Sequence, residues 1–137
     1  MTDIESWNEL ADLYISEHSY EKAAFCLEEL ILANPHNYLN HQRYAEVCYS
    51  QGTVDSLNAS RKHFSTALKL NPGSLRSLYG LHQTVLHLST NPKLKGKREE
   101  KVKNEDILSW TSSQLQHKYQ DIPRCSKIVE QYLKTGK

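Results

Sequence analysis

The sequence lacks the features of secreted, membrane-spanning and disulfide-rich domains. Its three cysteines are an odd number without a Cys-x-x-Cys pair, so reduced, buried thiols are expected in place of a disulfide framework. No apolar run approaches the roughly 20 residues that a membrane-spanning helix needs. The first residues also lack the basic start and apolar middle of a signal peptide. We therefore expect a chain that works in the cytosol or faces it.

The sequence also lacks a large excess of charge of either sign and the common catalytic motifs. The chain has 17 basic and 16 acidic residues, which argues against an electrostatic grip on nucleic acid over the whole surface. Phosphate-binding, dinucleotide-binding, HExxH and GxSxG motifs are absent. His41 and Cys48 share a predicted helix face, but zinc needs a third and fourth ligand, so core packing is expected. We predict no enzymatic activity, no cofactor, no metal and no small-molecule substrate.

Large and small residues alternate at the spacing of a helical hairpin. A first helix is predicted over residues 3–17, and one of its faces carries three large side chains and one alanine. The alanine lets a second helix, predicted over residues 20–33, approach closely. A proline then ends the second helix. These offsets are those of a tetratricopeptide repeat (TPR). The positions that carry the pattern are Trp7, Leu10, Ala11, Tyr14, Tyr20, Ala23, Leu27 and Pro35.

The pattern starts again after Pro35, with weaker copies further along the chain. The second repeat is marked by Tyr44, Ala45, Phe64, Ala67 and Pro72. Its slightly longer spacing between prolines predicts an insertion in the turn over residues 51–55. In the third repeat His82 stands where a small residue is expected and Gly80 comes two positions early, which predicts a shifted packing register. Trp110 is expected to anchor the last helix of that repeat in the core.

These repeats predict an all-α fold over a single domain, residues 1–137. We expect a right-handed TPR superhelix (α-solenoid) with about three helical hairpins and a C-terminal capping helix. Repeat 1 is predicted at about 4–37, repeat 2 at about 38–74, a divergent repeat 3 at about 75–120 and the capping helix at about 123–135. Residues 91–104 are rich in lysine and are predicted to form a basic loop or a frayed helical start. This basic segment could contact anionic lipid headgroups or an acidic partner, but a solvated loop is expected.

The first hairpin has a full repeat consensus and no polar capping helix ahead of it. We therefore expect this chain to be the C-terminal part of a longer array, or another protein to cover its first helix.

The candidate binding site follows from the geometry of TPR arrays, whose first helices line the concave side. Arginine and tyrosine dominate binding hot spots, so Tyr49, Arg76 and Tyr79 are the strongest candidates, and a solvated polar groove is the alternative for any single position. The positions predicted to face solvent there and to bind a partner are Asn8, Asp12, Gln42, Arg43, Glu46, Tyr49, Arg76, Tyr79 and Gln83.

A co-chaperone-type adaptor is the alternative function, in which the groove clamps the acidic tails of Hsp70 or Hsp90 or another peptide ligand. The typical clamp uses lysine, arginine and asparagine at five groove positions. Here Asp12 would repel an anionic tail, Gly80 offers it no contact, and Arg76 alone fits. We therefore do not expect a carboxylate clamp.

Several runs extend the likeness beyond the generic repeat. They are WNELADLY at 7–14, YEKAAFCLEEL at 20–30, NPHN at 34–37, QRYAEV at 42–47 and ALKLN at 67–71. Together they closely resemble the family of ER membrane protein complex subunit 2, a cytosolic TPR scaffold. The likeness weakens after about residue 89. Members of that family carry further repeats ahead of this segment, so the resemblance covers their C-terminal half.

The resemblance implies a non-catalytic scaffold held peripherally at the cytosolic face of the endoplasmic reticulum membrane. The complex inserts tail-anchored and multi-pass membrane proteins. The implied partners are its subunits 3 and 5 and the cytosolic subunit 8 or 9, with no nucleic acid involved.

Overall fold

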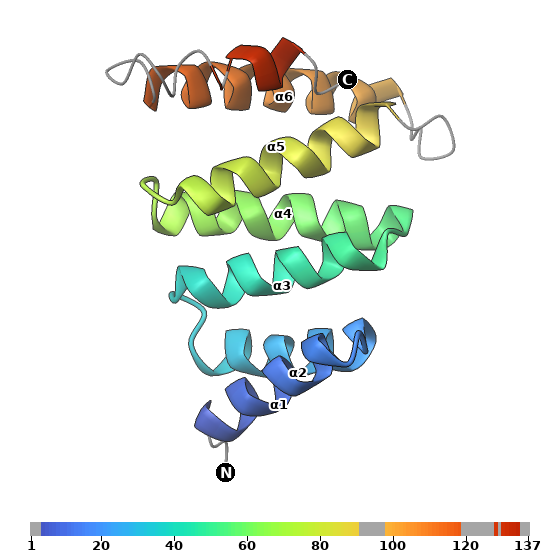
Figure 1. Ribbon diagram of the computed structural model, residues 1–137, viewed down its shortest axis with the longest axis vertical. Helices are drawn as coiled ribbons and strands as arrows, with labels where there is room; N and C mark the ends of the chain where they lie inside the picture. The colour runs from blue at the N-terminus through green and yellow to red at the C-terminus, as the bar shows by residue number, and fades with distance from the viewer. Residues whose placement is uncertain (1–3, 91–97, 119–127, 129, 135–137) are drawn as a thin grey trace. The chain divides into compact units, whose positions relative to one another are not determined.

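The computed structural model describes residues 4–90, 98–118, 128 and 130–134, and the regular structure in these ranges is helical (Figure 1). Helices α1 to α5 are joined by short turns, and residues 130–134 are also helical. The predicted all-α fold is confirmed. The helices are α1 (Ile4–Ser16), α2 (Tyr20–Ala33), α3 (Tyr38–Gln51), α4 (Val54–Leu70), α5 (Leu75–Thr90) and α6 (Arg98–Lys118).

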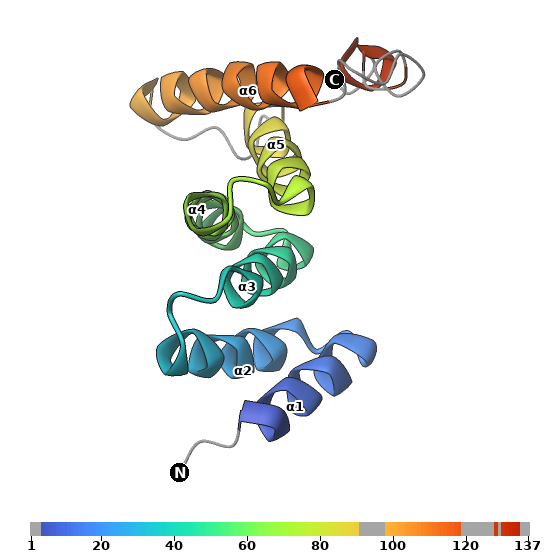
Figure 2. The same cartoon turned by 90° about the vertical axis from the view of Figure 1, so that its left-hand side faces the viewer.

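The chain forms two compact units, Met1–Gly80 and Leu81–Lys137, whose boundary lies inside α5. In the first unit α1 packs on α2 and α3 packs on α4 as antiparallel pairs, and α2 contacts α3 (Figure 2). The two pairs lie within the ranges predicted for the first two repeats. The division inside α5 was not predicted from the sequence.

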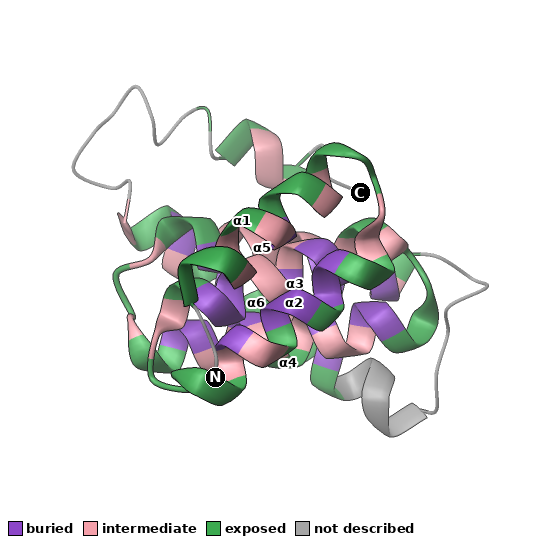
Figure 3. Cartoon of the chain, turned by 90° about the horizontal axis from the view of Figure 1, so that it is seen from below, coloured by how far each residue is buried: buried purple, intermediate pink, exposed green. Residues whose placement is uncertain are grey.

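Small residues let the helices of the first unit approach closely. Ala11, Ala23 and Leu27 are fully buried where α1 meets α2. The ring of Trp7 packs edge-on against Phe25 at 6.1 Å between centroids. Figure 3 shows the buried segments of α2 and α3 in purple. Burying a side chain the size of leucine contributes about 1.5–3 kcal/mol. The burial of Leu27 between α1 and α2 is therefore a main source of stability for the hairpin.

The turn between α3 and α4 is short. Gly52 ends α3 in the left-handed conformation at φ 74°, which glycine adopts without steric cost. Thr53 then caps α4, and its hydroxyl and that of Ser56 exchange hydrogen bonds with the backbone in a capping box. The predicted insertion in the turn over residues 51–55 is therefore wrong. The extra residues lengthen α4, which has 17 residues against 14 in α2.

Gly80 sets the distance between α4 and α5 within the first unit. A β-carbon added at Gly80 would collide with the ring of Phe64, which is buried. Gly80 thus lets α5 approach α4 closely, a role that the repeat pattern assigns to a small residue at position 82. Accordingly His82 is buried in the second unit, and its Nδ1 lies 2.9 Å from Thr111 Oγ1.

Helix α6 corrects two expectations for the third repeat. It begins at Arg98, so residues 98–104 are helical. This agrees with the predicted alternative of a helical start and not with the predicted loop, while residues 91–97 lie outside the described residues. Arginine, glutamate and lysine are good helix formers and explain the early start. Trp110 is 49% exposed and does not anchor the core. Thr111 and Leu115 of the same helix are buried instead. Residues 119–127, where the predicted capping helix begins, are outside the described part.

Two histidines connect α3 with α4. His41 Nε2 lies 2.8 Å from the carbonyl oxygen of Pro35, and because a carbonyl only accepts, His41 donates there. Its Nδ1 then accepts from Nδ1 of His63 at 3.1 Å. Burial lowers the pKa of His63 from about 6.5 to about 4, with smaller contributions in the same direction from His41 and Lys62 and an opposing one from Glu28. The folded chain therefore holds His63 neutral.

Gly80→Ala tests the contact with Phe64. In an exposed helix interior this change would stabilise by up to about 1 kcal/mol, but here the new methyl group overpacks the core, at a cost of about 1–3 kcal/mol. We expect a net loss of stability in urea unfolding. Combining it with Phe64→Leu should recover part of the loss, and a stabilised single variant would contradict the close contact.

The neutral state of His63 predicts a loss of stability in mild acid. The depressed pKa contributes stability that is present above about pH 6.5 and is lost as the pH falls toward about 4. The urea midpoint of the wild-type chain should fall over this range, and His63→Gln should flatten the dependence. Exposed His18 provides the control variant, His18→Gln. Equal pH profiles for wild type and His63→Gln would exclude this role.

Candidate functional site

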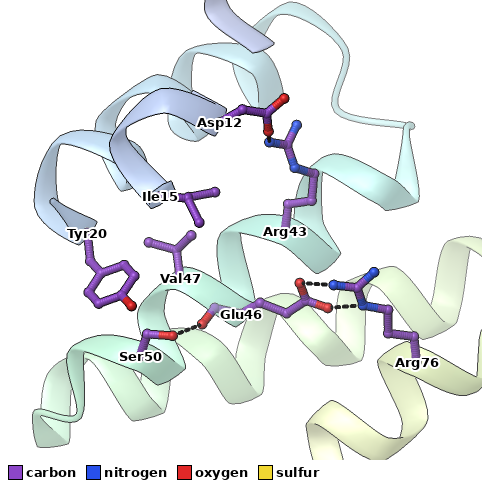
Figure 4. Close-up of a pocket in the computed structure, with 8 residues that line it drawn as sticks. All are labelled: Asp12, Ile15, Tyr20, Arg43, Glu46, Val47, Ser50 and Arg76. Atoms are coloured by element: carbon purple, nitrogen blue, oxygen red, sulfur yellow. Dashed lines mark hydrogen bonds and ion pairs between the residues drawn. The ribbon is translucent and has the colours of Figure 1, made fainter. Parts of the chain in front are cut away.

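One pocket in the first unit brings together residues of α1, α2, α3 and α5. It has a volume of about 380 Å³, and Figure 4 shows its lining. We call it the inter-repeat pocket. Four of the residues predicted to bind a partner line it, together with residues that the prediction did not include. The lining residues are Asp12, Ile15, Tyr20, Arg43, Glu46, Val47, Ser50 and Arg76.

An ion pair joins α1 to α3 at one side of the pocket. Nη2 of Arg43 contacts Oδ1 of Asp12, and Nη1 of Arg43 donates to Oδ1 of Asn8 at 2.9 Å. The side chain of Arg43 is 25% exposed and that of Asp12 is 71% exposed. Arg43 is therefore held within the protein surface, while the carboxylate of Asp12 projects to solvent.

A second ion pair joins α3 to α5. Nε and Nη2 of Arg76 donate to the two carboxylate oxygens of Glu46 at 2.5 and 2.8 Å. This two-point geometry is the strongest arrangement available to an arginine and a carboxylate. Here the arginine is the exposed partner, at 72%, and Glu46 is 30% exposed. The two pairs thus expose opposite charges.

The rest of the pocket is mainly apolar. Val47 is buried, and Ile15 and Tyr20 are half-buried beside it. Figure 4 shows Ile15 and Val47 facing one another, to one side of the charged residues. Ser50 Oγ donates to the backbone oxygen of Glu46 at 3.1 Å. A few polar groups around an apolar surface are typical of sites that bind a partner.

Gln42 does not face solvent, so this part of the prediction is wrong. It is buried, and its side-chain oxygen accepts hydrogen bonds from the hydroxyls of Ser74 and Ser77 at 3.0 and 2.9 Å. The bonds join α3 to the start of α5. Gln42 is therefore a packing residue that holds the two helices which carry Glu46 and Arg76.

The other predicted residues lie outside the lining of the pocket. Asn8 is half-buried and reaches the site through Arg43. Tyr49 and Tyr79 are half-buried residues of the first unit, and Gln83 belongs to the second unit. Their part in binding stays a prediction.

Ile15, Tyr20, Val47 and Ser50 were missed as pocket residues, although Tyr20 was predicted to pack the hairpin. Ile15 lies one helical turn after Asp12, and Ser50 lies one turn after Glu46. Helical spacing from the predicted polar positions could have found them.

The arrangement does not suit a clamp for acidic tails. Arg43 is held against Asp12 and Asn8, and Gly80 lies against Phe64 in place of facing a ligand. An anionic tail would also meet the exposed carboxylate of Asp12.

The buried cysteines of the first unit are unreactive thiols. Burial raises the pKa of Cys26 and of Cys48 above the ordinary thiol value, so little thiolate forms at neutral pH. Within the described residues, histidine, cysteine, aspartate and glutamate side chains do not gather in threes as a metal site requires. Among the helices described, none combines the length and apolarity needed to cross a bilayer.

A second pocket of about 450 Å³ lies on the first hairpin, between α1 and α2. It is more apolar than the inter-repeat pocket. Its lining consists of Trp7, Leu10, Tyr14, Glu21, Lys22, Phe25 and Cys26.

The sequence is similar to those of subunits of a known protein complex. Residues 1–63 match the family described as the EMC2 TPR-like repeat domain. The chain is 48% identical to ER membrane protein complex subunit 2-B of Xenopus laevis and 47% identical to ER membrane protein complex subunit 2 of Xenopus tropicalis, over 97% of this chain and 46% of each relative. It is 29% identical to TPR repeat protein oca3 of Schizosaccharomyces pombe, over 64% of this chain and 33% of that protein. The chain spans somewhat less than half the length of the Xenopus proteins.

The exposure of Asp12 and Arg76 predicts weak coupling within each ion pair. Exposed pairs contribute about 0.2–1 kcal/mol because solvent screens them. A double-mutant cycle with Glu46→Gln and Arg76→Gln, read by urea unfolding, should give a coupling energy in this range. A coupling above about 2 kcal/mol would contradict the expected screening of the pair by solvent.

Proposed function

We propose that the chain, which is homologous over nearly its whole length to part of ER membrane protein complex subunit 2, serves as a non-catalytic scaffold that holds other proteins of such a complex. The two Xenopus relatives carry the complex in their names. Paired helices with polar and apolar groups on one surface fit a role in holding polypeptides. A scaffold of this kind holds other polypeptides and requires no bond-making chemistry.

The inter-repeat pocket is the observation that carries this proposal. Most of its lining comes from the first helices α1, α3 and α5, with Tyr20 added from α2, and the first helices of TPR arrays line the concave surface that these proteins use for binding. Its apolar residues, Ile15 and Val47, offer a surface for burial, and the paired charges around them offer specificity. A segment from a partner protein would therefore bind across the three helices.

The finer assignments follow from the family resemblance. We propose that the partners are subunits 3 and 5 of the ER membrane protein complex and its subunit 8 or 9. The site of action would be the cytosolic face of the endoplasmic reticulum membrane, with membrane contact only peripheral or through these partners. The insertion of tail-anchored and multi-pass membrane proteins would then be supported by the chain as a structural part of the complex.

Affinity capture tests the pocket as the partner site. We expect the tagged chain to recover subunits of the ER membrane protein complex from detergent-solubilised cells. Ile15→Ser combined with Arg43→Gln removes an apolar contact and a charge from the pocket. Loss of well-buried interface contacts weakens binding by about 1.4 kcal/mol or more, which corresponds to a tenfold loss of affinity. Recovery should therefore fall at least about tenfold.

A matched control makes the same kinds of change elsewhere in the first unit. Leu39 and Lys69 are exposed on α3 and α4 and do not line the pocket. Leu39→Ser combined with Lys69→Gln should leave recovery unchanged. Equal recovery by the pocket variant and wild type, at equal helicity, would reject the pocket as the partner site. Recovery of chaperones alone would favour the adaptor alternative.

A further inference from the structure

The two ion pairs give the inter-repeat pocket a direction. In each pair one partner is held by the protein surface, and the other projects to solvent. The projecting group is the carboxylate of Asp12 on α1 and the guanidinium of Arg76 on α5. Figure 4 shows these two residues well apart, with Arg43 and Glu46 between them. A ligand therefore meets negative charge at the α1 end of the pocket and positive charge at the α5 end.

Both projecting groups can meet a ligand while the ion pairs stay in place. The pairs use Oδ1 of Asp12 and Nε and Nη2 of Arg76. A ligand cation can approach Oδ2 of Asp12, and a ligand carboxylate can approach Nη1 of Arg76. The inner partners, Arg43 and Glu46, hold the projecting groups in position and so reduce the entropy that binding would cost.

We propose that the inter-repeat pocket selects an extended peptide segment of dipolar character. Its lysine or arginine lies at Asp12, its aspartate or glutamate lies at Arg76, and an apolar side chain between them contacts Ile15 and Val47. The proposal rests on the proposed function and names the class of segment that this site takes. A uniformly acidic or uniformly basic segment would meet a like charge at one end, so charge complementarity excludes it.

The helix spacing sets the length of the segment. Helix α3 is joined to α1 and to α5 by one ion pair each. If each step is given the usual spacing of neighbouring helices, about 8–10 Å, the ligand has to span roughly 16–20 Å. An extended chain covers about 3.3–3.6 Å per residue. The two charges of the ligand should therefore stand about five or six residues apart.

Capped hexapeptides labelled with a fluorophore test the proposal. The four probes share leucine at the third position and serine elsewhere, and they carry lysine and glutamate, two lysines, two glutamates or two glutamines at their ends. Fluorescence anisotropy should show that the wild-type chain binds the lysine–glutamate peptide about fivefold more tightly than the other three, because two exposed charge contacts together contribute on that scale. Added salt should reduce this preference.

Charge reversal in the protein should change the preferred peptide in a defined order. Arg76→Glu makes both ends acidic and should favour the peptide with two lysines. Asp12→Lys makes both ends basic and should favour the peptide with two glutamates. The double variant should again prefer the lysine–glutamate peptide. The exposed residues Lys69 and Glu105 supply matched controls, Lys69→Glu and Glu105→Lys, which change net charge equally and should keep the wild-type preference.

The outcomes separate this inference from the proposed function. Equal affinity for all four peptides, or a ranking that the reversals leave unchanged, would overturn the dipolar selection while the capture result stands. Absence of peptide binding together with normal capture would overturn it in the same way, and absence of both would reject the pocket altogether. If a reversal unfolds the chain, Arg76→Gln and Asp12→Asn replace it. Arg76→Gln should abolish the preference over the peptide with two lysines, and Asp12→Asn should abolish the preference over the peptide with two glutamates.

Discussion

Close packing of helices through alanine and glycine is the constraint on which the rest of the structure depends. Ala11, Ala23, Ala45 and Ala67 are fully buried, and Gly80 has no room for a β-carbon. A larger side chain at these positions would push the helices apart. Because α1, α3 and α5 stay close, side chains that lie about 30 residues apart in the sequence, such as those of Glu46 and Arg76, reach each other. The inter-repeat pocket exists only at this helix spacing.

The first two hairpins could be predicted closely from the sequence, because local periodicity and packing agree there. The helix predicted over residues 3–17 is Ile4–Ser16, and that predicted over 20–33 is Tyr20–Ala33. The third repeat was predicted less well. Its basic segment has few apolar residues to mark a helix, yet the part from Arg98 is helical. Helix propensity, and not an apolar stripe, explains that start.

The candidate site was predicted in part. Repeat positions identified Asp12, Arg43, Glu46 and Arg76, but the pairing between them depends on the register of α5, which Gly80 sets. The burial of Gln42 depends on two serine hydroxyls of that helix, and a sequence pattern that treats each helix alone cannot show it. Ile15, by contrast, follows Asp12 by one helical turn, so helical spacing alone could have placed it in the pocket.

The central claim is that a partner protein binds in the inter-repeat pocket. The most direct test is site-specific photo-crosslinking in the assembled complex, with a photoreactive phenylalanine analogue placed at Ser50, an exposed residue of the pocket lining. A second analogue at exposed Leu39, also on α3 but outside the lining, serves for comparison. We expect the analogue at Ser50 to crosslink to a segment of another subunit, identified by mass spectrometry. Crosslinks from Leu39 and none from Ser50 would contradict this claim.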